Sequence, residues 1–160
     1  MSKLETKFKS ADASTGFLFW KVANLHQRLQ RQVLRDLEIS PTQFSILACY
    51  FFMKSGQTLP TQSDICEMAG LDKMLVSDVT KALLAKKFIR KSENIHDKRS
   101  FQIELTHEGV KVCNQAVKLI ENLDDKFFNQ SGSKSNFHKM LKKIEQGIDV
   151  EWAEQTIKQR

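Results

Sequence analysis

The sequence predicts a mainly α-helical chain with one small β-hairpin, which is an α+β fold class. Over long stretches, apolar residues recur at spacings of three and four, the period of a helix that buries one face. One short stretch, residues 88–105, instead alternates apolar and polar side chains on either side of a polar turn, as two paired strands do. At 160 residues, the chain is long enough to bury a core without disulfides.

Helical segments follow from this period, and local signals mark where several of them begin and end. We expect helices over residues 13–37, 41–53, 62–69, 73–87 and 107–128, and a last amphipathic helix that carries Phe137 to Ile148. A Ser, Thr or Asp stands before three of them, twice with a Gln or Asp three residues on, which is the pattern of a capping box. These residues are Ser40 with Gln43, Thr61 with Asp64, and Asp72. Gly70 suits a left-handed helix end.

The charge of the chain favours an anionic partner. The net charge is +6 and the pI is about 9.3, with 28% charged and 41% hydrophobic residues. Residues 72–99 hold eight Lys and Arg against four Asp and Glu, so this window carries +4 of the excess. A basic patch of this kind is typical of nucleic-acid binding. A chance cluster on a solvated surface is the alternative that charge alone leaves open.

Several classes of protein are not indicated. Cys49, Cys66 and Cys113 are odd in number and lack zinc-ligand spacing, so we expect reduced core residues in a cytoplasmic protein, with no metal and no cofactor. The first fifteen residues lack the apolar region of a signal peptide, and the apolar runs are too short to span a membrane. Because no nucleophile–base pair or glycine-rich phosphate loop is present, we expect no catalytic residues and no enzyme.

The order of the central elements is informative. A short capped helix, a glycine turn and a second capped helix form a helix-turn-helix, and the hairpin after them makes it a winged helix over residues 39–106. In such a unit the second helix turns one stripe to the core and the other to the major groove of double-stranded DNA. The element order and the charge together therefore indicate a DNA-binding domain.

The second helix of this unit holds candidate DNA contacts on its outward and flanking faces. Short hydrogen-bonding side chains near its N-terminus can reach base edges, and cations can bind phosphate. The candidates are Lys73, Met74, Ser77, Asp78, Thr80 and Lys81. Thr61 and Gln62 begin the supporting helix, where backbone N–H groups and the positive end of the helix dipole can hold a phosphate. The alternative is a plain solvated surface.

The polar turn of the hairpin is a second candidate contact. An Arg at such a tip suits the negative potential of a narrow minor groove, and we assign Arg99 to that role. Asp97 stands two positions away and can hold the guanidinium through a hydrogen bond. His96 and Lys98 are candidate phosphate contacts. Alternatively, Arg99 and Asp97 form only a surface ion pair.

Several of these motifs together resemble a known family. The stretches "TQSDICEMAGLDKMLVSDVTKALLAKKFI" and "HDKRSFQIELTHEGVKV" are similar to the multiple antibiotic resistance regulator (MarR) family, as are the "PTQFSIL" helix, Asp97 with Arg99, and the "LTHEG" return. The resemblance covers about Ile39 to Cys113. Phe88 departs from it, because the family usually has a glycine there between the recognition helix and the wing. We therefore expect a different solution for that turn.

The resemblance implies a homodimer whose flanking helices, residues 12–37 and 107–158, form a helical dimerisation region. It also implies a pseudo-palindromic operator and repression that a small-molecule effector or an oxidant relieves. Trp20, His26, Phe51 and Phe52 are candidates for an effector pocket between the dimer helices and the DNA-binding lobe. For each of these residues alone, packing in the core or the dimer interface is the stronger alternative.

The sequence therefore predicts a cytoplasmic, sequence-specific transcriptional regulator. We expect a repressor that binds its operator as a homodimer and that an effector can release. Two alternatives stay open: a winged helix that serves as a protein-interaction module, and a DNA-binding protein without a regulatory role.

Overall fold

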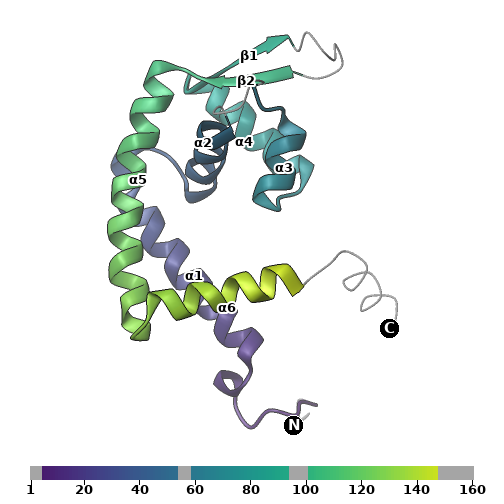
Figure 1. Ribbon diagram of the computed structural model, residues 1–160, viewed down its shortest axis with the longest axis vertical. Coiled ribbons are helices and arrows are strands. Elements are labelled where there is room, and N and C mark those ends of the chain that lie inside the picture. Colours follow the sequence, from purple (N-terminus) through teal and green to yellow (C-terminus); the bar gives the residue numbers. More distant parts are fainter. Residues whose placement is uncertain (1–4, 54–58, 94–100, 148–160) are drawn as a thin grey trace. The chain divides into compact units, whose positions relative to one another are not determined.

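The computed structural model describes residues 5–53, 59–93 and 101–147 of the chain. Its helices are α1 (Thr15–Val33), α2 (Pro41–Met53), α3 (Gln62–Ala69), α4 (Lys73–Ala85), α5 (His107–Phe128) and α6 (Lys134–Gly147) (Figure 1). Its strands are β1 (Ile89–Glu93) and β2 (Phe101–Leu105), which pair antiparallel. The predicted class, mainly α with a small β-hairpin, is confirmed. Two compact units divide the chain, residues 1–120 and residues 121–160, and their boundary falls inside α5.

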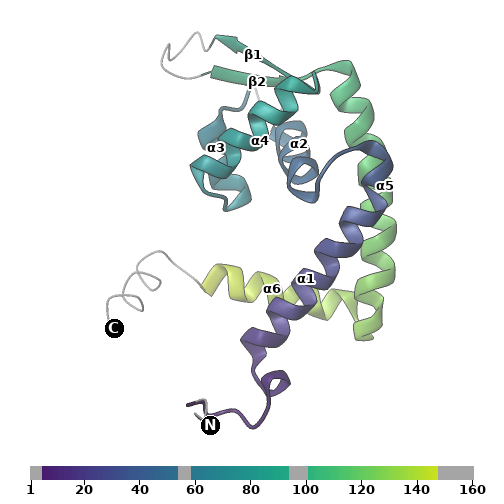
Figure 2. The same cartoon turned by 180° about the vertical axis from the view of Figure 1, so that it is seen from behind.

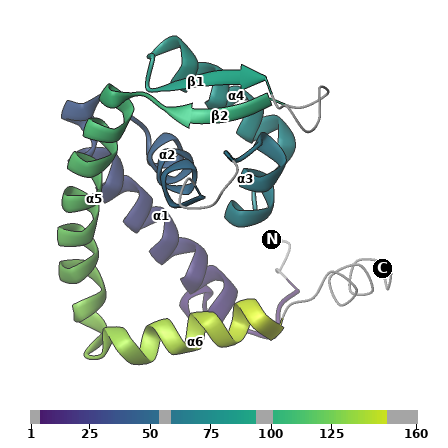
Figure 3. The same ribbon diagram turned by 45° about the horizontal axis from the view of Figure 1, so that its top comes forward.

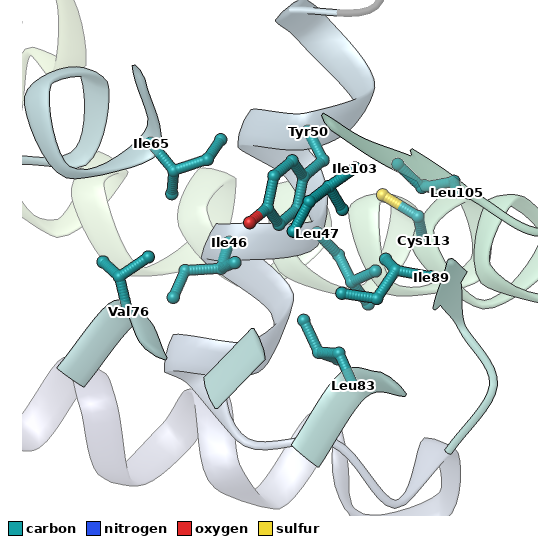
Figure 4. Close-up of a cluster of buried hydrophobic side chains, with 10 residues drawn as sticks. All are labelled: Ile46, Leu47, Tyr50, Ile65, Val76, Leu83, Ile89, Ile103, Leu105 and Cys113. Carbon is teal, nitrogen blue, oxygen red and sulfur yellow. The ribbon is translucent and has the colours of Figure 1, made fainter. Parts of the chain in front are cut away.

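Helix α2 is the centre of the first unit. It contacts α1, α3, α4 and β2 (Figure 3). From Phe44 to Met53 its sequence is apolar on nearly every side apart from Ser45, so water is a poor neighbour for any of its faces. One core cluster packs around it and draws on every element from α2 to α5 (Figure 4). Its members are Ile46, Leu47, Tyr50, Ile65, Val76, Leu83, Ile89, Ile103, Leu105 and Cys113.

A second buried cluster joins the end of α1 to the first part of α5. Its buried members are Leu34, Ile39, Val112, Ala116 and Ile120. The helix expected over residues 13–37 ends earlier, because α1 stops at Val33 and residues 35–37 form a 3-10 turn. Glu38 then takes the left-handed conformation, with φ of 53°. The chain can therefore turn sharply into α2.

The predicted capping boxes are confirmed. The Ser40 N–H donates to Gln43 Oε1 and the Gln43 N–H donates to Ser40 Oγ, both at 3.1 Å. Before α3, the Thr61 N–H donates to Asp64 Oδ2 at 2.7 Å, and the Asp64 N–H donates to Thr61 Oγ1 at 3.3 Å. Asp72 accepts from the Leu75 N–H at 2.8 Å and so caps α4. Each cap satisfies N–H groups that a helix start leaves without partners.

The hairpin lies over α3 and α4, which are side by side in both views (Figure 2). Its register pairs Ile89 with Leu105 and Glu93 with Phe101. The Ile103 N–H also donates to the Pro60 carbonyl at 2.9 Å, so β2 holds the segment that enters α3. The alternation of the second strand predicts that Phe101, Ile103 and Leu105 are all buried, and Ile103 and Leu105 are. For Phe101 the prediction is wrong: it is 53% exposed, because the strand runs on past the core.

The turn from α4 to β1 uses a left-handed residue that is not glycine. The Lys87 N–H donates to the Leu84 carbonyl at 2.9 Å, and the Phe88 N–H donates to the Leu83 carbonyl at 3.0 Å. This pair of bonds is a Schellman motif, which requires a left-handed residue just past the helix. That residue is Lys87, with φ of 59°, so the expectation that Phe88 stands at the glycine position is wrong by one residue.

The start of α5 is fastened to the same turn. The Thr106 hydroxyl lies 2.7 Å from the Lys87 carbonyl and accepts from the Gly109 N–H at 3.0 Å. A Cβ built on Gly109 would lie 1.9 Å from the Phe88 carbonyl oxygen, a distance that no side chain tolerates. The "LTHEG" return thus supplies a cap at Thr106 and a close backbone approach at Gly109.

The second unit contains the end of α5, a 3-10 turn at Asn129–Ser131 and α6. Gly132 is left-handed, with φ of 76°, and lets the chain turn back. The rings of Phe128 and Phe137 stack with their centroids 5.5 Å apart, and Lys134 pairs with Asp125. On α6, Met140 and Ile144 are exposed apolar side chains.

Lys87→Gly should stabilise the protein. A left-handed conformation costs an L-residue roughly 1 kcal/mol, whereas glycine adopts it freely. We expect the free energy of unfolding of Lys87→Gly to exceed that of Lys87→Ala by about 1 kcal/mol, measured by urea denaturation. Lys87→Ala is the matched control, because it removes the same side chain and keeps the Cβ. A Gly variant no more stable than the Ala variant would contradict the strain at this turn.

Candidate nucleic-acid interface

Helices α3 and α4 form a helix-turn-helix with well-defined joints. Gly70 ends α3 in the left-handed conformation, with φ of 61°. The Leu71 N–H then donates to the Cys66 carbonyl at 3.2 Å, which closes a second Schellman motif. Asp72 caps α4 two residues later. Few residues separate the two helices, and nearly every one has a defined hydrogen-bonding role, so the angle between α3 and α4 is tightly determined.

Three residues at helical spacing are exposed along the outward face of α4. Met74 is 76% exposed, and Asp78 and Lys81 are exposed one and two turns further along. Lys73 is exposed in the first turn, while Ser77 is half-buried at the edge of this face. We call Met74, Asp78 and Lys81 the outer stripe. It carries an apolar, a negative and a positive group, a mixture that can distinguish base edges better than a purely cationic surface.

Thr80 does not belong to this face. It is fully buried, with 0% of its surface exposed, and its hydroxyl oxygen lies 3.3 Å from that of Tyr50 in α2. On α4 it falls between the buried residues Val76 and Leu83, one turn away on either side. The expectation that Thr80 contacts a base is therefore wrong. Sequence reasoning also missed Tyr50, whose polar partner is thirty positions away and leaves no local pattern.

The charges of the outer stripe are paired with each other. Lys81 Nζ lies 3.0 Å from Asp78 Oδ1, and the two side chains are 71% and 64% exposed. Exposed pairs of this kind contribute only ~0.2–1 kcal/mol, so a phosphate can compete for the ammonium group. Asp78 would then remain as an exposed negative charge on this face. It repels phosphate and accepts hydrogen bonds, for example from cytosine N4.

At the start of α3, groups that were expected to bind a phosphate are already hydrogen-bonded in the capping box of Thr61 and Asp64. The Thr61 hydroxyl donates to Asp64 Oδ2 at 2.8 Å, in addition to the two backbone bonds of the box. The Asp64 carboxylate therefore already lies at the positive end of the helix dipole and competes with a phosphate there. Gln62 is half-buried in the first turn. A phosphate contact through Gln62 stays a prediction.

The wing is described at its base. His96, Asp97, Lys98 and Arg99, which were assigned to its tip, lie outside the described residues. At the base, Arg90 is directly opposite Glu104 in the register and donates to its Oε2 from Nη2 at 2.6 Å and from Nε at 2.9 Å. Lys91 Nζ lies 5.2 Å from the centroid of the Phe101 ring. Arg90 and Lys91 are thus exposed cations on β1 that the sequence reasoning did not single out.

The residues assigned to an effector pocket lie on two helices. Trp20 is 60% exposed in α1 and its ring is 5.7 Å from that of Phe17. Phe51 and Phe52 are exposed at the end of α2, and His26 is half-buried in α1. Trp20 lines a hollow of about 450 Å³ along α1, with Lys21, Asn24, Leu25, Arg28 and Arg31.

A second hollow of about 410 Å³ lies between α1 and the first turns of α2. Its lining comes from α1, α2, the end of α3 and the turn that follows it. The residues are Gln27, Gln30, Arg31, Ser40, Pro41, Thr42, Ser45, Cys49, Ala69 and Leu71. Burial raises the pKa of the Cys49 thiol, so the reactive thiolate is disfavoured there at neutral pH. The lining of this hollow thus includes one arginine, Arg31, among polar and apolar side chains.

In the parts of the chain that the structure describes, no helix has the length and apolar character that crossing a bilayer requires. In the same ranges, no group of His, Cys, Asp and Glu side chains is arranged to hold a metal ion.

Comparison with known proteins gives a consistent picture. A family model described as the MarR family matches residues 39–101. The chain is 31% identical over 140 residues to the "Uncharacterized HTH-type transcriptional regulator YdcH" of Bacillus subtilis (strain 168), and the match covers 87% of this chain and 95% of that protein.

Solved structures share the fold. A mutant MarR from E. coli complexed with operator DNA has a TM-score of 0.72 at 22% identity, over 81% of this chain and 91% of that one. The S. aureus MepR–DNA complex has a TM-score of 0.71 at 22% identity, over 81% of this chain and 98% of that one. BpsR of Bordetella bronchiseptica, whose DNA binding is regulated by 6-hydroxynicotinic acid, has 0.75 at 19% identity, over 87% and 99%. The chain therefore belongs to the MarR family of winged-helix transcriptional regulators.

Proposed function

We propose that this regulator is a cytoplasmic repressor that binds a pseudo-palindromic DNA operator as a homodimer. The observation that carries the proposal is the exposed N-terminal half of α4, held between a capped α3 and the base of the wing. A helix presented in this way fits the major groove, and a hairpin beside it reaches the next minor groove. Two of the solved structures similar to this chain, those of E. coli MarR and S. aureus MepR, are complexes with DNA, which supports the proposal.

The roles of the side chains follow from their chemistry and exposure. Met74 is placed for apolar contact with a thymine methyl group, and Lys73 and Lys81 are placed for phosphate. Ser77 and Asp78 are the candidates for hydrogen bonds to base edges. At the wing tip, we keep the assignment of Arg99 to the minor groove, held by Asp97, with His96 and Lys98 on phosphate. Gln62 completes the set at the start of α3.

The proposed partner that covers α1 is a second copy of the chain. No residue of α1 is buried in the single chain, although the helix is rich in large apolar side chains. The exposed ones are Phe17, Leu18, Phe19, Trp20, Val22 and Leu25. So many exposed large apolar side chains on one helix favour an interface over a solvated surface. Residues 12–37 and 107–158 are our proposed dimerisation region, and residues 39–106 the DNA-binding domain.

An effector that releases the repressor is the finer part of the proposal. The hollow between α1 and α2 joins the proposed dimer helix to the DNA-binding lobe, and Arg31 beside Cys49 and Leu71 suits a small organic anion. Trp20, His26, Phe51 and Phe52 stay candidates for contacts from the dimer side. A ligand that binds better to a lobe spacing unsuited to DNA would lower operator affinity by shifting the population of states.

Operator binding is the first test. We expect the protein to select one duplex sequence from a random library and to bind it at least ~10²-fold more tightly than a scrambled duplex at moderate salt, measured by gel shift. Equal affinity for both duplexes at every salt concentration would indicate a DNA-binding protein without regulation. No binding at low salt would indicate a protein-interaction module. Either result would overturn the proposal.

Asp78→Asn should strengthen binding to unrelated DNA. The change removes a carboxylate beside the phosphates and releases Lys81, so we expect affinity for a scrambled duplex to rise about threefold at low salt, within the range of exposed ion pairs. The gain should shrink as salt is added, because screening weakens exposed charges. Asp36→Asn is the matched control. Asp36 is an exposed carboxylate paired with Arg35, and it is not among the proposed DNA contacts. An equal gain in both variants would place Asp78 away from the DNA.

The dimer is tested by mass. Light scattering at micromolar concentration should return about twice 18.5 kDa for the native protein. Leu18→Glu places a charge on the exposed apolar face of α1 and should return the single-chain mass, because an unpaired buried charge costs several kcal/mol. Gln27→Glu, also exposed on α1, is the control and should stay dimeric. A native protein of 18.5 kDa would rule out the homodimer.

A further inference from the structure

One buried hydrogen bond connects the recognition helix to the centre of the core. Tyr50 in α2 and Thr80 in α4 are both 0% exposed, and their hydroxyl oxygens are 3.3 Å apart, with either able to donate. Within the described ranges, Thr80 is the one polar residue in the buried set. Thirty positions of sequence separate the two residues, so this bond is a tertiary link between helices.

The surroundings leave these two hydroxyls few other partners. Figure 4 shows the Tyr50 ring among Ile46, Ile65 and Ile103, in a cluster that is otherwise hydrocarbon and one thiol. Burial raises the pKa of Tyr50 to about 12, so the phenol keeps its proton at physiological pH. On separation, the Thr80 hydroxyl could turn to the carbonyl one helical turn before it, but the buried Tyr50 phenol would lose its partner. A buried hydroxyl without a partner costs roughly 1–3 kcal/mol, which disfavours any arrangement that separates the pair.

We propose that the Tyr50–Thr80 hydrogen bond is a positioning device that sets the rotation of α4 about its own axis and thereby decides which side chains meet the bases. Apolar contacts are non-directional and tolerate small rotations, whereas a hydrogen bond weakens steeply with distance and angle. Thr80 lies one residue before Lys81 and two after Asp78, so its attachment fixes the direction of the outer stripe. The inference rests on the proposed function, since it concerns how the protein reads DNA.

The size of the effect follows from helix geometry. With side chains, a helix has a radius of roughly 5–6 Å, so a rotation of about 20° moves a side-chain tip by ~2 Å. That displacement is enough to break a hydrogen bond to a base edge. Phosphate contacts through long, flexible lysines adapt to it. A loosened α4 should therefore lose discrimination between sequences and keep its general affinity for DNA.

The stability of the fold does not require this pair. Replacing both partners of a buried hydrogen bond by apolar groups of the same shape is nearly neutral for stability. The double variant Tyr50→Phe with Thr80→Val makes this replacement. It removes the directional hydrogen bond and keeps the volume of the two side chains nearly unchanged. Thr80→Ser keeps a hydroxyl in place and is the rescue variant. Tyr50→Phe alone is a second variant that should fold, because the Thr80 hydroxyl can turn to the carbonyl one helical turn before it.

The experiment compares two dissociation constants for each variant. One is for the duplex that the native protein selects from a random library, and the other is for a scrambled duplex. We expect the ratio between them to fall about tenfold in the double variant and in Tyr50→Phe, while the affinity for the scrambled duplex stays within about twofold of native. In Thr80→Ser the ratio should stay native. Thermal unfolding checks that each variant is folded.

Three outcomes would overturn the inference. A native ratio in folded double and Tyr50→Phe variants would make the pair an ordinary core contact. Equal loss of affinity for both duplexes would mean that the pair has only a structural role. The same conclusion would follow if folded Thr80→Ser lost as much of the ratio between the two dissociation constants as the double variant does. If the native protein selects no duplex at all, the proposed function fails first, and that result is distinct because it appears before any variant is made.

Discussion

The burial of α2 is the constraint on which the rest of the first unit depends. A helix that is apolar on nearly all sides must bury most of its surface, and four elements cover it together: α1, α3, α4 and the hairpin. Phe51 and Phe52, at its end, stay exposed. Its one phenol, Tyr50, needs a polar partner in the same dry interior and finds it on α4. The element that is proposed to read DNA is thus also a wall of the core. Its inner face is determined by packing and by one hydrogen bond, and only its outer stripe, with Lys73 and Ser77 beside it, is left for the proposed recognition.

That outer surface is less positive than the composition indicates. Lys81 pairs with Asp78, and Arg90 pairs with Glu104, so two of the cations nearest the proposed interface have a carboxylate beside them. The exposed Lys81–Asp78 pair contributes little to stability, so we expect its effect to fall mainly on selectivity between duplexes. A surface of unpaired cations would bind any duplex. A cation with a carboxylate beside it binds most favourably where the DNA offers an acceptor to the cation and a donor to the carboxylate.

Local chemistry made much of the fold predictable, and tertiary contacts explain the errors. The boxes at Ser40 and Thr61, the cap at Asp72 and the glycine turn at Gly70 depend on residues within four positions, and all are confirmed. Thr80 was misplaced because it sits near the edge of the buried stripe, and its partner lies in another helix. The strand alternation continues into Phe101, but the core ends before it. The wing tip and the pocket residues stay predictions, since the tip lies outside the described residues and the pocket depends on the proposed dimer.

The joints of the first unit bear on how an effector could act. Left-handed residues end three segments, at Glu38, Gly70 and Lys87, and two of the three are not glycine. Lys86 donates to the Glu38 carbonyl, so the entrance to α2 and the end of α4 are fastened to each other, and Thr106 fastens α5 to the same turn. With its helices cross-connected in this way, the lobe is suited to move as a body. For the proposed dimer, we therefore expect the proposed effector to change the spacing of two intact lobes, while the shape of α4 stays the same in both states.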